Sequence, residues 1–107
     1  MASQRIYGPA QLTNSSVEIY VSTAGQTVVV RHVHVSNPSG AAVTFFLSVG
    51  VDAAGTRLFD AYSIAAGAVL DWFCYLPLVG GTDNIYAHAG TTTTLVITIA
   101  ADVNVTG

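Results

Sequence analysis

The sequence predicts an all-β chain that folds as a single-domain antiparallel β-sandwich with an extended N-terminal arm. Turn-forming glycines recur at positions 25, 40, 55, 67, 81 and 90, a spacing that leaves room for strands and too little for useful helices. Between the turns, β-branched and aromatic residues are frequent, and apolar residues alternate at the period of a strand. A jelly-roll and an immunoglobulin-like topology both fit this pattern.

The N-terminal residues 1–16 are interpreted as an arm that lies outside a sandwich of residues 17–107. Residues 5–12 carry apolar side chains but are interrupted by Gly8 and Pro9. Proline within a strand is tolerated mainly at a sheet edge. We therefore expect the arm to contain an edge segment that packs on a neighbouring subunit.

Eight strands are expected in the sandwich, and their inner faces follow from alternation. The expected ranges are 17–21, 27–37, 43–49, 57–64, 69–76, 85–89, 95–100 and 102–105. Expected inner residues of three of these strands are Val17, Ile19, Val21, Val43, Phe45, Leu47, Val49, Leu95, Ile97 and Ile99. Tyr20 is then expected to face outward, and His32 and His34 to share a face with Val28 and Val30.

Strand 69–76 is expected to divide its aromatic residues between the two faces of the sheet. Trp72 and Cys74 share a face with neighbouring leucines, which predicts that both belong to the core. Phe73 or Tyr75 then lies at a contact on the opposite face. Since the chain has one cysteine, it cannot form an intrachain disulfide.

Charged residues make up 8% of the chain, compared with about 25% in an ordinary soluble domain. Hydrophobic residues make up 51%, so a lone monomer would have little charge to prevent association. The net charge of −3 and the absence of lysine argue against a nucleic-acid partner. No apolar run has the length of a membrane span, and no export signal is visible, so we expect synthesis in a cytoplasm and no membrane partner.

His32 and His34 are the residues that most resemble a metal site, because a two-residue step in a strand puts both imidazoles on one face. His88 would be the third ligand. No acidic residue or cysteine stands at recognisable ligand spacing beside the pair, so we interpret them as strand or interface histidines. We expect no metal, no cofactor and no catalytic residue, since no nucleophile motif is present either.

Arg31 lies in a valine-rich strand, where an unpaired guanidinium would be costly. We expect a carboxylate from Asp60, from Asp71 or from an adjacent subunit to pair with it. If that pair is buried, removal of the acid should destabilise the fold by about 3–5 kcal/mol.

Four stretches of the chain, residues 30–37, 46–50, 55–60 and 67–73, resemble the small β-sandwich virion proteins of tailed bacteriophages. The resemblance spans about residues 17–105 and rests on packing and turn motifs. It implies a non-enzymatic structural protein of the virion, either a capsid decoration protein or a minor tail protein. A carbohydrate or host-surface binding module is the alternative, since exposed aromatic side chains could line a sugar site.

The resemblance and the low content of charged residues together predict a homo-oligomer. The resemblance implies that the oligomer is a trimer and that it binds phage capsid or tail proteins. The contact is expected to use apolar or hydroxyl side chains, the arm and the paired histidines. The expected interface residues are Arg5, Ile6, Tyr7, Leu12, Tyr20, His32, His34, Phe46 and Tyr75.

Overall fold

The computed structural model describes residues 2–50, 53, 55–91 and 94–105. They form the strands β1 (Ala2–Gln11), β2 (Val17–Val21), β3 (Gln26–Ser36), β4 (Val43–Val49), β5 (Arg57–Ile64), β6 (Val69–Val79), β7 (Asn84–Ala89) and β8 (Val96–Val105). The predicted all-β class is confirmed. Within these ranges, no helix has the length and apolarity that crossing a membrane requires.

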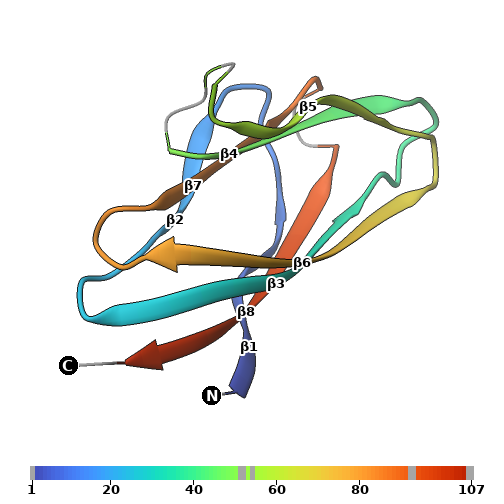
Figure 1. The fold of residues 1–107 in the computed structure, drawn as a ribbon. Coiled ribbons are helices and arrows are strands. Elements are labelled where there is room, and N and C mark those ends of the chain that lie inside the picture. The colour runs from blue at the N-terminus through green and yellow to red at the C-terminus, as the bar shows by residue number, and fades with distance from the viewer. Residues whose placement is uncertain (1, 51–52, 54, 92–93, 106–107) are drawn as a thin grey trace.

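The strands form two antiparallel four-stranded sheets that pack face to face (Figure 1). Sheet A has the order β1-β8-β3-β6, and sheet B has the order β2-β7-β4-β5. Each strand of the first half pairs with its counterpart from the second half, β1 with β8, β2 with β7, β3 with β6 and β4 with β5. This is a long hairpin rolled across two sheets, so the topology is the jelly roll and the immunoglobulin-like alternative is not adopted.

The structure differs from the expected division into an arm and a sandwich. Residues 2–11 form β1, an edge strand of sheet A that pairs with β8 along its length. The expected strands 95–100 and 102–105 are instead one continuous strand, β8. The total of eight strands still agrees with expectation, because β1 adds one strand and the merging of two expected strands into β8 removes one.

A bulge at Gly8 and Pro9 explains how β1 continues through residues that the sequence suggested were a break. Tyr7 pairs with Ile99 and Ala10 with Ile97, so β1 has one extra residue in this interval. Gly8 has a φ of 81°, and a Cβ there would overlap the carbonyl oxygen of Ile97. Proline is tolerated because β1 lies at the sheet edge.

The hydrophobic core lies between the two sheets, and several predicted inner faces are confirmed. Strands β4 and β8 contribute buried alternating residues: Val43, Phe45, Leu47, Ile97 and Ile99. Leu95 is buried just before β8 begins. Trp72 and Cys74 pack against this cluster from β6.

In β3 the alternation is broken by a bulge at Arg31. Against β8, Val30 pairs with Ala101 and His32 pairs with Ala100, so Arg31 is an extra residue. Buried valines face the core on both sides of the bulge: Val28, Val30, Val33 and Val35. The assignment of His32 and His34 to the face of Val28 and Val30 was therefore wrong, because one extra residue exchanges the two faces.

A similar shift corrects the expected faces of β2. The pairing of β2 with β7 slips between Glu18 and Tyr20. Tyr20, expected to point outward, packs against the core, and Val21, expected inside, is exposed. A single irregularity again reverses the faces of the residues beyond it.

Asn37 holds together the two connections that cross between the sheets at one end of the sandwich. Its side chain is 1% exposed and donates from Nδ2 to the carbonyl oxygens of Ala41 and Ile64, at 2.8 and 2.9 Å. Its Oδ1 accepts from the backbone N–H and the hydroxyl of Ser39. Its backbone carbonyl accepts from the N–H of Gly67 at 2.9 Å. The β3–β4 and β5–β6 connections are thereby joined through one buried amide.

The substitution Asn37→Ala is expected to destabilise the protein by about 2–4 kcal/mol, because it leaves buried carbonyl groups without hydrogen-bond donors. Urea unfolding followed by tryptophan fluorescence measures this loss. Ser39→Ala is the matched control, since it removes one hydroxyl at the rim of the same network and should cost about 1 kcal/mol or less. Equal losses in the two variants would contradict the role assigned to Asn37.

Candidate functional site

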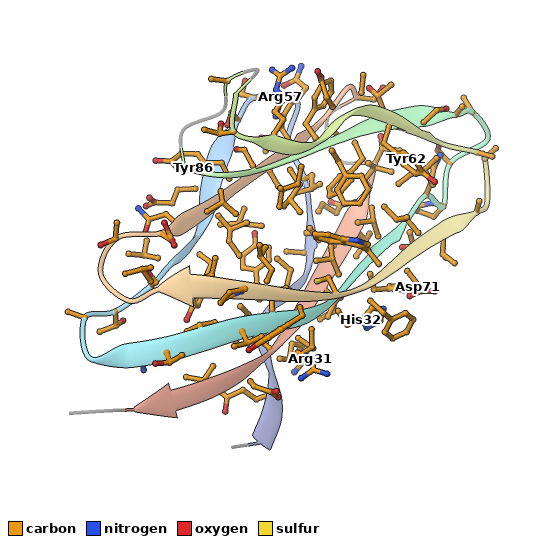
Figure 2. The ribbon with its side chains drawn as sticks, in the orientation of Figure 1. Arg31, His32, Arg57, Tyr62, Asp71 and Tyr86 are labelled. Atoms are coloured by element: carbon orange, nitrogen blue, oxygen red, sulfur yellow. The ribbon has the colours of Figure 1, made fainter. Side chains whose placement is uncertain are left out.

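Polar and aromatic side chains gather on the outer face of sheet A, which points away from sheet B. We call this group the sheet A patch: Arg31, His32, His34, Asp71, Phe73, Tyr75 and Asp102. Figure 2 shows Arg31, His32 and Asp71 on this outer side, where β3 and β6 run next to each other. The bulge at Arg31 makes this arrangement possible, since it turns Arg31 and both histidines of β3 outward.

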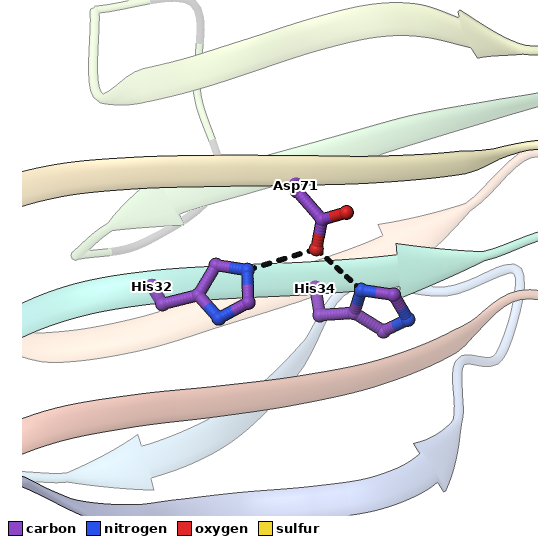
Figure 3. Close-up of side chains that lie close together, drawn as sticks. All are labelled: His32, His34 and Asp71. Atoms are coloured by element: carbon purple, nitrogen blue, oxygen red, sulfur yellow. Dashed lines mark hydrogen bonds and ion pairs between the residues drawn. The ribbon is translucent and has the colours of Figure 1, made fainter.

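His32 and His34 both contact the same carboxylate oxygen. His34 lies directly opposite Asp71 in the β3–β6 pairing, and its Nδ1 is 2.6 Å from Oδ1 of Asp71 (Figure 3). Nε2 of His32 is 2.9 Å from the same oxygen. Since an ionised carboxylate only accepts hydrogen bonds, both ring nitrogens act as donors. The bonds from His34 and then His32 hold the pKa of the Asp71 carboxyl below its usual value.

Phe73 and Tyr75 cover the edge of this cluster. The Phe73 ring stacks on the His32 ring, with centroids 4.2 Å apart and planes 2° from parallel. This stacking restricts the orientation of the imidazole. Tyr75 lies under the Arg31 guanidinium, which is 5.8 Å from the centre of the ring. Both rings remain largely in solvent, at 75% for Phe73 and 67% for Tyr75.

Arg31 pairs with a carboxylate, as expected, but the two candidates named from the sequence, Asp60 and Asp71, were wrong. Nη1 of Arg31 contacts Oδ2 of Asp102 at 3.2 Å, whereas Asp60 pairs with Arg57 and Asp71 with the two histidines. The reason is the bulge, which turns Arg31 toward the neighbouring strand β8 on the outer face. The Arg31 side chain is 53% exposed, so the pair is not the buried ion pair whose loss would cost several kcal/mol.

An open hollow of about 710 Å³ lies beside the patch, lined by Arg31, His32, Phe73, Cys74, Tyr75 and Ala100. The Cys74 thiol donates to the carbonyl oxygen of Val30 at 3.4 Å. Burial raises the pKa of this thiol, and the nearby Arg31 charge only partly opposes that effect. Cys74 is therefore poorly suited to act as a nucleophile, in agreement with its expected place against the core.

The expected interface residues are spread over both sheets. Arg5 is exposed on β1, while Ile6, Tyr7 and Tyr20 pack in part against the core. Leu12 is 2% exposed, so its expected interface role was wrong. Its side chain belongs to the hydrophobic core. Its backbone N–H donates to the carbonyl oxygen of Leu95 at 2.9 Å, which holds the chain in place after β1 ends.

Phe46 and His88 lie on sheet B, away from the sheet A patch. Their rings stack at 4.2 Å, and the Arg57 guanidinium lies 5.0 Å from the Phe46 centroid. His88 therefore cannot join His32 and His34 as a ligand. Asp71 is the residue that joins His32 and His34. Its position beside them follows from the pairing of β3 with β6, which the sequence alone does not give.

No protein-family model, curated protein or solved structure matches the chain. The resemblance to phage virion proteins therefore stays a prediction. Since one fold hosts many functions, function has to be inferred from the surface and its side chains. The sheet A patch combines exposed aromatic rings with two imidazoles and a carboxylate.

A double-mutant cycle with Arg31→Gln and Asp102→Asn is expected to give a coupling energy of about 0.2–1 kcal/mol, because the guanidinium is half in solvent. Chemical denaturation of the four proteins measures it, and the cycle cancels other contacts of either residue. A coupling energy of about 3 kcal/mol or more would instead indicate a buried pair.

Proposed function

We propose that the protein is a non-enzymatic structural component of a tailed-phage virion, made in the host cytoplasm, that self-associates and docks on the virion surface. The observation that carries self-association is strand β6. It is 11 residues long, it forms an edge of sheet A, and its outward side chains are mostly apolar and exposed. Such an edge offers unpaired backbone groups to another chain.

The exposed apolar row on β6 consists of Val69, Phe73, Tyr75 and Val79. Soluble proteins usually protect an edge of this length with lysine or other charged residues. This chain has no lysine, and the one charged residue of β6, Asp71, is hydrogen-bonded to His32 and His34. A second copy of the chain that covers β6 would remove both the exposed rings and the open edge from water.

The jelly-roll topology supports the virion role by analogy, since jelly rolls are frequent in viral capsid domains as well as in lectins. A capsid decoration role is preferred over a tail role because a small single domain suits a site that is repeated over a capsid. The trimeric state follows from the resemblance to phage proteins, and β6 supports self-association without specifying the number of copies.

Carbohydrate or host-surface binding is the second candidate, and the hollow beside Phe73 and Tyr75 favours it. Two exposed rings at the edge of an open hollow could stack against a sugar, with Arg31 at hydrogen-bonding reach of its hydroxyl groups. Binding of the purified chain to a glycan array, lost in Tyr75→Ala, would favour this candidate over self-association.

The double variant Phe73→Lys/Tyr75→Lys is expected to convert an oligomer into monomers of 11.1 kDa, because paired positive charges on β6 oppose a second copy. Light scattering at micromolar concentration measures the mass, with a trimer expected for the unaltered chain. The matched control is Val17→Lys/Val21→Lys, which places the same charges on exposed positions of β2 and should leave the oligomer intact.

Two results would overturn the proposal. An unaltered chain that is monomeric and does not bind purified phage heads or tails would exclude both self-association and docking. Equal dissociation by the β2 control would show that β6 is not the contact.

A further inference from the structure

Three potential metal ligands converge on the outer face of sheet A. Nε2 of His32, Nδ1 of His34 and a carboxylate oxygen of Asp71 all lie within 4.8 Å of one another. They come from neighbouring strands in a continuous ladder, so the backbone fixes their spacing. The Phe73 ring stacked on His32 further limits how that imidazole can turn.

The chemistry of this set favours a borderline transition metal. Imidazole nitrogens suit Zn²⁺, Cu²⁺, Ni²⁺ and Fe²⁺, whereas Mg²⁺ and Ca²⁺ prefer sites made of oxygen ligands. Two histidines and one carboxylate also leave a position free for water, as in sites that have three protein ligands. We propose that His32, His34 and Asp71 bind one divalent transition metal ion, for which Zn²⁺ is the representative.

The ligand side chains must rearrange to hold such an ion. The two ring nitrogens lie up to 4.8 Å apart, so the imidazoles must approach each other by up to about 1.5 Å. Tetrahedral Zn²⁺ with bonds of about 2.0–2.1 Å holds neighbouring ligand atoms about 3.3 Å apart. Oδ1 of Asp71 lies 2.9 Å from His32 and 2.6 Å from His34, so it must withdraw by about half an ångström. The Asp71 side chain is partly exposed and can rotate into that position.

Metal binding replaces the two hydrogen bonds of the cluster. Each ring nitrogen that now donates to Asp71 instead presents its lone pair to the metal, and the ring proton resides on the other nitrogen. Both imidazoles are partly exposed, so water can carry that proton between the two nitrogens. Two nitrogen–metal bonds and one oxygen–metal bond form, and no oxidation or reduction is involved.

Titration of the full chain, without a histidine tag, with Zn²⁺ tests this site directly. Isothermal calorimetry should give one ion per chain, and Mg²⁺ should not compete. His34→Ala and Asp71→Ala should each weaken Zn²⁺ binding by about tenfold or more. His88→Ala is the matched control, because it removes the histidine on sheet B and should leave the affinity unchanged.

Cobalt spectroscopy identifies the ligands independently of affinity. Co²⁺ bound to nitrogen and oxygen should show visible bands without the intense near-ultraviolet band of a thiolate–cobalt bond, and Cys74→Ser should not alter the spectrum. Circular dichroism checks that each variant is folded.

The proposal fails if the unaltered chain binds no stoichiometric Zn²⁺, which would leave the three residues as a hydrogen-bonded cluster alone. It also fails if His88→Ala weakens binding as much as His34→Ala, or if Cys74→Ser abolishes the cobalt spectrum. These readouts use the purified chain, so their outcome does not depend on whether the protein belongs to a virion.

Discussion

The bulge in β3 at Arg31 is the constraint on which both the core and the outer face of sheet A depend. A regular strand would bury either the pair Val28 and Val30 or the pair Val33 and Val35, but not both. One extra residue against β8 lets all four valines reach the core. The same irregularity puts Arg31 and the two histidines that follow it on the outside, so the sheet A patch is a consequence of how the core is filled.

Strand β6 then adds its outward side chains to that face. Because β6 alternates without interruption, Trp72 and Cys74 face the core while Asp71, Phe73 and Tyr75 face outward. Asp71 meets the histidines of β3, and the two rings remain in solvent. A strand at the edge of the sheet thus provides both an apolar surface for another chain and the carboxylate of a polar cluster. The proposed contact and the proposed metal site are neighbours for this reason.

The chain has few charged residues with which to protect the exposed edge and the apolar side chains of β6. Three arginines and six acidic residues must serve the entire surface. In the part of the chain that the structure describes, Asp60, Asp71 and Asp102 are paired with arginine or histidine side chains. Few charges are left to keep edges apart, so apolar contacts with other molecules become favourable. Inside, polarity is used sparingly, with Asn37 as the buried amide that joins two connections through fully used donors and acceptors.

The sequence by itself determined the all-β class, most strand positions, and the buried faces of β4 and β8, because alternation over a few residues is a local property. It also placed Trp72 inside and Tyr75 outside. Only the tertiary structure decided the jelly-roll order, the inclusion of residues 2–11 as β1, and the partners of Arg31, His32 and His34. These depend on which strands become neighbours and on bulges that reverse a face. No local pattern encodes a register between residues 37 positions apart, such as His34 and Asp71.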